Sequence, residues 1–366
     1  RTPVRLAPRV LLQRLRALSP EKLADKRVGI IGTGATSVQC VPHLARACKE
    51  LYVFQRTPSS IDVKNNPQTD PAWAAAQEPG WHQKRMDNFN ALVSGIPQAE
   101  DLVNDGWTDL IGKLLVGIRE GRGGDFSASG IARAVELADF EKMEEIRARV
   151  ASVVADPATA EALKPYYRQF CKRPCFHNEY LETFNRPNVT LVDTKGKGVE
   201  RITEKGVVAG GREYELDCLI YASGFEVGTD YSRRAGFQLY GRDGHSLADT
   251  WAGGVRTLHG MHVHGFPNCF IMSNPQAGFT ASYPHMLNEQ AKHLAYIIRR
   301  GLDAGAASIE VSAEAEQAWV EQCIAKARQT GDFFESCRRS PSRTRRCRRS
   351  TCASRACGRS RRGASC

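Results

Sequence analysis

The stretch KRVGIIGTGATSVQCVPHLARACKELYVFQRTP, residues 26–58, decides the fold of this chain. It opens with a β-type run at Lys26–Ile31, passes through a glycine turn into an amphipathic helix at Thr36–Lys49, and ends in an apolar strand at Leu51–Gln55. A strand, a helix and a second strand within about 30 residues are typical of a β-α-β unit with parallel strands. The stretch therefore predicts an α/β fold of the Rossmann type.

The glycine turn, Gly32-Thr33-Gly34-Ala35-Thr36-Ser37, predicts a binding site for the diphosphate of a dinucleotide. Gly32 would permit the tight turn, and Gly34 would let the diphosphate approach the backbone. The small Ser37 stands where a glycine or alanine usually lets helix and strand pack closely. Unpaired N–H groups and the positive end of the helix dipole would face the phosphates. We include Gln39, in the next turn of this helix, in the predicted site.

The end of the second strand predicts which dinucleotide binds. A site for NAD carries Asp or Glu there to hold the ribose 2′-hydroxyl, whereas this chain has Gln55-Arg56-Thr57. An acidic side chain would repel a 2′-phosphate, and an arginine fork binds one through two charge-assisted hydrogen bonds. We therefore expect NADP(H) as the cofactor.

The rest of the chain alternates between helical and strand signals. Residues 60–165 read as a helical insertion, with apolar periodicity at Ile131–Val154 and a helix at 156–163 that opens with an N-cap aspartate and a proline. Strand signals return at Asn188–Val192, Val199–Ala209 and Leu216–Ala222, and Gly210-Gly211 is expected to form the hairpin turn between the last two. Phe266–Met272 reads as a short buried run, followed by helices at Tyr283–Arg300 and about 313–328.

Positive charge is concentrated at the two ends of the chain, and five of the twelve cysteines lie in the C-terminal segment 336–366. Residues 336–366 hold eleven Arg and residues 1–18 hold five, with no acidic residue in either segment. Without these sixteen arginines the net charge of +11 becomes −5 for residues 19–335, which argues against nucleic acid as the partner. We expect residues 336–366 to be a disordered tail or non-native coding sequence. No apolar run is long enough for a membrane span. The seven cysteines outside this tail lie scattered along the sequence, so we expect a cytoplasmic chain whose thiols are reduced.

Four stretches in the same order carry a resemblance to one enzyme family. Residues 26–58, CKRPCFHNEYLETFNRPNV at 171–189, DCLIYASGF at 217–225 and GFPNCFIMSNPQAGFTASYPH at 265–285 resemble Baeyer–Villiger monooxygenases, which are class B flavin monooxygenases. The resemblance covers roughly residues 20–335. It implies a flavoprotein with two dinucleotide-binding domains, FAD and NADP(H) as cofactors, and a ketone and O2 as substrates.

The resemblance also implies roles for single residues. Arg56, Thr57 and Lys172 match positions that grip the 2′-phosphate, and Arg173 matches the catalytic arginine beside the flavin and nicotinamide. A fixed cation there would stabilise the negative charge that develops on the carbonyl oxygen. The linker between the cofactor domains matches Ala222, Ser223 and Gly224, where serine replaces the family's threonine.

The sequence departs from the family at its N-terminal side. The glycine-rich FAD-binding unit and the family fingerprint that precede the NADP segment are not in this chain, and residues 1–18 do not resemble them. We therefore expect an atypical basic stretch at 1–18, an NADP(H) domain at 19–225 and the C-terminal part of an FAD domain at 226–335. The chain alone is then expected to hold about half of a flavin site.

Other interpretations of the sequence remain open. The chain could be a non-catalytic NADP-binding fragment, a flavin monooxygenase that oxidises nitrogen or sulfur, or, through its Arg-rich ends, a nucleic-acid-binding protein. Cys171, Cys175 and His177 suit no common zinc site. His259, His262 and His264 alternate as in a strand, which favours hydrogen-bonded or substrate-facing histidines over a metal site.

Overall fold

The computed structural model describes residues 20–225, 231–272, 276, 277, 280, 282–326 and 337. These residues divide into two compact units. The first comprises 20–76, 104–225 and 337, and the second comprises 77–103 and the described residues between 231 and 326. The insertion that the sequence predicts at 60–165 thus contributes residues to both units. Residues 1–18 and most of 336–366 lie outside the described residues.

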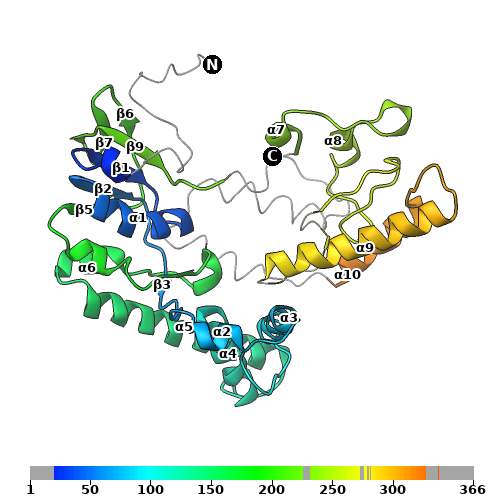
Figure 1. The fold of residues 1–366 in the computed structure, drawn as a ribbon, viewed down its shortest axis with the longest axis horizontal. Helices are drawn as coiled ribbons and strands as arrows, with labels where there is room; N and C mark the ends of the chain where they lie inside the picture. The colour runs from blue at the N-terminus through cyan, green and yellow to red at the C-terminus, as the bar shows by residue number, and fades with distance from the viewer. Residues whose placement is uncertain are drawn as a thin grey trace. The chain divides into compact units, whose positions relative to one another are not determined.

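A four-stranded parallel sheet organises the first unit and confirms the predicted α/β fold. Its strands lie in the order β5-β2-β1-β9 (Figure 1). Their bounds are Arg27–Ile31 for β1, Glu50–Gln55 for β2, Val189–Asp193 for β5 and Cys218–Tyr221 for β9. Neighbouring strands pair in parallel, so all four carboxyl ends meet at one edge of the sheet. This edge brings together segments that lie up to about 190 residues apart.

The two faces of the sheet bury different partners, because side chains alternate along each strand. Val28, Ile30, Leu51 and Val53 pack against a helical layer, in which α1 (Ala35–Ala47) is central. Tyr52 and Phe54 pack on the other face, against an antiparallel sheet of the order β6-β7-β8. Figure 1 shows α1 and α6 on one side of the parallel strands and β6 and β7 on the other.

The remaining elements of the first unit are short strands and helices. The strands are β3 (Ile61–Asp62), β4 (Cys175–Phe176), β6 (Arg201–Ile202), β7 (Gly206–Ala209) and β8 (Arg212–Glu215). The helices are α2 (Pro71–Ala75), α4 (Gly106–Arg119), α5 (Ala128–Val153) and α6 (Pro157–Leu163), with 3-10 turns η2 (Pro20–Lys22), η3 (Gln169–Cys171) and η4 (Glu182–Asn185). Asp156 accepts a hydrogen bond from the backbone of Thr159 and Pro157 opens α6, as the sequence predicts.

A hairpin turn forms at Gly210-Gly211, but the prediction is wrong about the strands that this turn joins. The turn joins β7 to β8, and these two strands pair antiparallel. The Val199–Ala209 run divides into β6 and β7, which pair antiparallel. Strand β9 lies outside the hairpin and pairs with β1 in the parallel sheet. Strand β8, REYE, is largely exposed, so its apolar content was too low to mark it as a strand.

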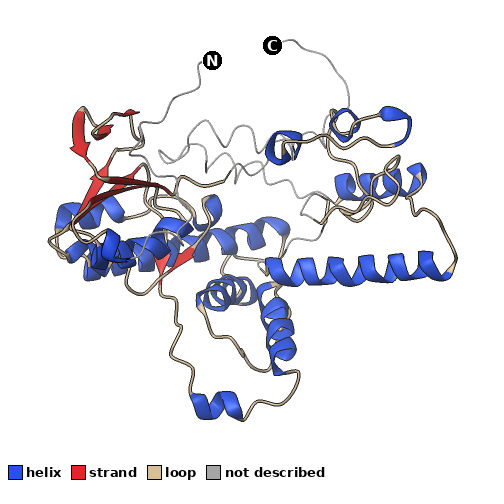
Figure 2. Cartoon of the chain, turned by 45° about the horizontal axis from the view of Figure 1, so that its top comes forward, coloured by secondary structure: helices blue, strands red, loops and turns tan. Residues whose placement is uncertain are grey.

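The second unit is built from helices and turns (Figure 2). Its helical elements are α3 (Trp81–Val93), α7 (Tyr231–Ala235), η5 (Arg242–Gly244), α8 (Leu247–Thr250), α9 (Tyr283–Asp303) and α10 (Ala313–Ala325). Leu247, Val263 and Phe266 form a small core. Phe266–Met272 is not the buried run that the sequence predicts, since Phe266 is buried but Met272 is 43% exposed. Among the described helices of both units, none has the length and apolarity that crossing a bilayer requires.

Candidate functional site at the carboxyl edge of the sheet

Gly32 makes the sharp turn that follows β1. Its φ of +113° is a backbone conformation that residues with a Cβ rarely adopt. A Cβ at this position would also lie 2.4 Å from the carbonyl oxygen of Ala222. The Ala222 amide in turn donates to the carbonyl of Ile31, with 2.9 Å between nitrogen and oxygen. The turn and the linker after β9 are therefore packed directly against each other.

Gly34 leaves open space in front of the first turn of α1. A Cβ built on it meets no atom within 4 Å, and no side chain caps the helix at this end. The first turn carries no acidic residue, so nothing in it opposes the positive end of the helix dipole. Ala35 and the exposed Thr36 present their amides here. The open space and uncapped amides fit a bound diphosphate.

The side chains of the turn hold the structure together. The Thr33 hydroxyl donates to the carbonyl of Thr57 at 2.7 Å, and Ser59 donates to the carbonyl of Thr33 at 2.5 Å. Ser37 is fully buried, which fits the close helix–strand packing expected of a small residue, but its hydroxyl has no hydrogen-bond partner among the described residues. Gln39 is exposed and its amide donates to the carbonyl of Ala35 at 2.9 Å.

Gln55 ends β2 with its side chain buried. Its amide nitrogen donates to the carbonyl of Ala162, in α6, at 2.7 Å. The next residue, Arg56, is exposed at the edge of the sheet. The position that carries an acidic residue in an NAD site is therefore turned inward, and the first exposed side chain after it is a cation.

Lys172 joins Arg56 and Thr57 from a distant part of the chain. Its ammonium group donates to the Thr57 hydroxyl and, at 3.3 Å, to the carbonyl of Pro58. It also lies 4.9 Å from the centre of the Tyr167 ring. Burial and, to a smaller extent, the charge of Arg56 lower the pKa of Lys172 to about 8. The two cations repel each other, so an anion bound between them would relieve the repulsion.

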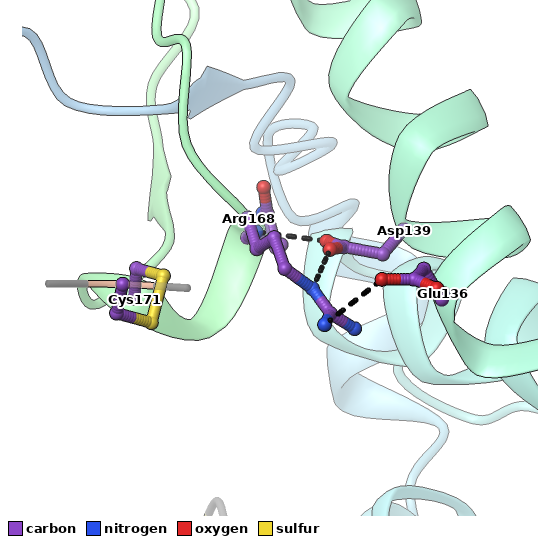
Figure 3. The surroundings of a disulfide bond; sticks show 6 residues. Glu136, Asp139, Arg168 and Cys171 are labelled. Carbon is purple, nitrogen blue, oxygen red and sulfur yellow. Dashed lines mark hydrogen bonds and ion pairs between the residues drawn. A yellow bond between two sulfur atoms is a disulfide. The ribbon is translucent and has the colours of Figure 1, made fainter. Parts of the chain in front are cut away.

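The segment that carries Lys172 is positioned by residues that the sequence did not single out. Tyr167, which is buried, accepts a hydrogen bond from the amide of Ser60 at 2.9 Å and donates to the carbonyl of Pro58 at 3.0 Å. Asp139 accepts hydrogen bonds from the Gln169 amide and the Arg168 side chain (Figure 3). The neighbouring Tyr166 is 59% exposed, so the residue type alone could not have separated the two tyrosines.

Arg173, Ser223 and Gly224 are all exposed. Arg173 follows Lys172 directly, and β4 begins two residues later with the amide of Cys175 donating to the carbonyl of Ser60 at 3.1 Å. Gly224 has a φ of +94°. The structure thus brings the glycine turn, Arg56, Thr57, Lys172 and the 222–224 linker to the edge of the first unit. The catalytic role of Arg173 stays a prediction.

The expectation of unpaired cysteines is wrong at one pair. Cys171 and Cys337 form a disulfide across a sequence separation of 166 residues. Such a pairing depends on tertiary proximity, and the spacing of the cysteines along the sequence carries no trace of it. The six other cysteines of the described residues are free thiols.

The second unit holds a separate cavity of about 540 Å³. Histidines, methionines and polar side chains line it, among them His259, Met261, His285, Met286 and His293. The prediction that His259–His264 alternate as in a strand is wrong, because His259 has a φ of +55° and Leu258 bridges back to His262 in a tight turn. His262 is buried, while the His264 side chain is half exposed.

Several curated proteins resemble most of this chain. No family model matches it. Neopentalenolactone D synthase of Streptomyces avermitilis is 59% identical over 319 residues, which covers 87% of this chain and 54% of that protein. Baeyer-Villiger monooxygenase ATR8 of Stachybotrys chlorohalonatus is 52% identical over 316 residues, with coverage of 86% and 51%. The chain spans about half the length of the curated relatives it matches.

Several solved structures resemble the fold. The polycyclic ketone monooxygenase of Thermothelomyces thermophila has a TM-score of 0.78 at 36% identity, over 92% of this chain and 55% of that one. The complex of OTEMO with FAD and NADP has a TM-score of 0.65 at 28% identity, over 83% and 57%.

Proposed function

We propose that this chain, as a member of the Baeyer–Villiger monooxygenases, inserts one oxygen atom of O2 into a ketone with FAD and NADPH, giving an ester or lactone. The observation that carries the proposal is the group of Arg56, Thr57 and Lys172 beside an open glycine turn. This group fits the 2′-phosphate that distinguishes NADPH from NADH. The names of the relatives and the FAD and NADP of the OTEMO complex support the reaction and the cofactors.

We assign NADP(H) binding to the edge of the parallel sheet. The amides of Ala35 and Thr36 would hold the diphosphate above Gly34. Arg56 would donate two hydrogen bonds to the 2′-phosphate, and Thr57 and Lys172 would hold its other side. Binding of the dianion would stabilise the ammonium form of Lys172 and so raise its pKa.

Residues for FAD are incomplete in the described part of the chain. The one glycine turn of the strand–turn–helix type found there, at 32–37, is the one that Arg56 and Lys172 assign to NADP(H). Bound FAD would supply the redox chemistry in which NADPH is oxidised and O2 is activated. The role of this chain's residues is therefore to bind and orient the nicotinamide nucleotide and to provide Arg173.

Arg173 is the catalytic residue of the proposal. Its guanidinium would face the carbonyl oxygen of the ketone and stabilise the negative charge that develops there. Its neighbours support this role, because Lys172 on one side and β4 on the other fix the backbone from which it projects. Lysine could not replace it without losing the planar fork of donors.

A second candidate function is binding of NADP(H) without oxygenation by this chain. The observation that favours it is that the described residues provide the NADP(H) contacts but an incomplete set for FAD. Binding of NADPH would then be unaccompanied by turnover of any ketone.

The experiment that tests the proposal follows NADPH and oxygen together. The chain is titrated with NADPH and NADH by fluorescence, and then incubated with FAD, NADPH and a panel of cyclic and polycyclic ketones under 18O2. The proposal predicts tighter binding of NADPH than of NADH and products heavier by one 18O atom. Binding without labelled product would support the second candidate, and equal binding of the two nucleotides would remove the 2′-phosphate argument.

We further propose that the enzyme works in the cytoplasm, whose NADPH pool would supply the reductant. The partners expected are the ketone and O2.

A further inference from the structure

The segment that presents Lys172 and Arg173 is fixed on both sides. On its N-terminal side, Asp139 accepts hydrogen bonds from the Gln169 amide at 2.8 Å and the Arg168 side chain at 3.0 Å, which ties η3 to α5 (Figure 3). On its C-terminal side, the Cys175 amide donates to Ser60 and β4 pairs with β3. Residues 170–174 span the interval between these two anchors.

A disulfide lies inside that interval. Cys171 is bonded to Cys337, which is fully buried, and is followed directly by Lys172. A disulfide fixes the separation of the two residues that it joins, so the link to a buried partner restrains the segment that carries Cys171. The restraint therefore acts on the residue beside the proposed 2′-phosphate contact.

The nearest cysteine in sequence is a poor competitor for this bond. Cys175 is buried, and burial raises the pKa of its thiol to about 11. Thiol–disulfide exchange needs a thiolate, so at neutral pH Cys175 attacks the Cys171–Cys337 bond only slowly. Opening of the bond then depends on an external reductant.

We propose that the Cys171–Cys337 disulfide is a redox-controlled tether that sets the affinity of the chain for NADPH. A small dithiol is the reductant: its thiolate attacks one sulfur of the bond and releases the other cysteine, and its second thiol then attacks the mixed disulfide and releases the remaining cysteine. Cys171 and Cys337 together take up two electrons and two protons, and the dithiol leaves as a cyclic disulfide. The inference rests on the proposed NADP(H) site.

The effect should be selective for NADPH, the nucleotide that carries the 2′-phosphate. Opening the bond lets residues 170–174 move, and Lys172 then holds the 2′-phosphate less often. NADH lacks that phosphate, so its affinity should not depend on the disulfide. We expect the dissociation constant for NADPH to rise about tenfold on reduction, the size of one lost hydrogen bond to a charged group.

The test compares the oxidised and the reduced forms of the chain. Iodoacetamide labelling and peptide mass mapping first establish the state of Cys171 and Cys337, and fluorescence titration then gives both affinities. Cys337→Ser should bind NADPH about tenfold more weakly with or without dithiothreitol, and bind NADH as the unaltered chain does. Cys269→Ala, a half-buried free cysteine of the second unit, is the control and should keep the full response to reductant.

Three results would overturn the tether. They are free thiols at both positions in the oxidised chain, equal NADPH affinity before and after reduction, and a parallel loss of NADH affinity, which would indicate general loosening. If NADPH binds equally well in both states, the tether alone fails. If NADPH binds no better than NADH in either state, the proposed NADP(H) site fails with it.

Discussion

The two units of the chain reach their structures in different ways. In the first, parallel strands bring chain segments far apart in sequence to one edge, where each contributes one or two residues to the site. In the second, helices and tight turns leave a cavity beside buried polar atoms that have no hydrogen-bond partner among the described residues, namely His262 Nε2 and His285 Nδ1. A sheet edge is thus an efficient way to assemble a binding site from distant segments, because strand pairing fixes every contributor at once.

The largest effect is expected at the tightest point of that edge. Gly32→Ala should lower the free energy of unfolding by about 2–4 kcal/mol, because the new Cβ would meet the Ala222 carbonyl at an unfavourable φ. Urea denaturation measures the change. Gly34→Ala is the matched control: open space surrounds it, so stability should change little while NADPH binds more weakly. Equal destabilisation by both variants would contradict this contrast.

A smaller effect is expected from removing one cation. Arg56→Ala should raise the dissociation constant for NADPH about ten- to hundredfold and that for NADH less than twofold, because only NADPH carries the 2′-phosphate. Fluorescence titration measures both. Arg201→Ala, an exposed arginine on β6, should change neither constant. If the dissociation constant for NADH rises as much as that for NADPH, Arg56 does not bind the 2′-phosphate.

The pKa of Lys172 gives a further, pH-dependent effect. Its value of about 8 lies below the ordinary 10.5, so the free chain loses this charge as pH rises through 8. NADPH affinity should therefore fall several-fold between pH 7 and pH 9, whereas NADH affinity should not. Lys172→Arg keeps its charge and should flatten the profile. An unchanged slope in that variant would assign the pH dependence to another group.

The same pKa predicts the sign of a stability change. Between pH 8 and 10.5 the unfolded chain holds the proton of Lys172 and the folded chain does not. The unfolded state then binds more protons, so the contribution of Lys172 to stability rises with pH across this window. In the Lys172→Met variant, the free energy of unfolding measured by urea denaturation should lack this rise between pH 8 and 10.5.

The smallest effect is expected at a buried hydroxyl. Ser37→Ala should leave stability unchanged or raise it by up to about 1 kcal/mol, because the Ser37 hydroxyl has no partner among the described residues. Thr33→Val is the control, since it removes a hydroxyl that donates to Thr57 and should lower stability by about 1 kcal/mol. Thermal unfolding of both variants checks the difference. A clear loss at Ser37 would indicate that its hydroxyl is hydrogen-bonded in solution.

The sequence predicted what depends on local order. The β-α-β unit and the cap of α6 follow from periodicity and from single residues, and the structure has both. The contact of Lys172 with Thr57 spans 115 residues, and the Cys171–Cys337 bond spans 166. The family resemblance suggested the first of these, and nothing in the sequence suggested the second. The histidine turn at 258–262 was missed because His259 adopts a positive φ that its residue type does not require.

The inward-facing Gln55 has a consequence for changing the nucleotide that the protein prefers. An engineer seeking NADH dependence would first place aspartate at the end of β2, as NAD-binding relatives of the Rossmann fold do. Here that carboxylate would lie in the interior, facing the Ala162 carbonyl instead of a ribose, and would be an uncompensated buried charge. Redesign should therefore begin one residue later, at position 56, and keep Gln55, whose side chain holds β2 to α6 by a hydrogen bond.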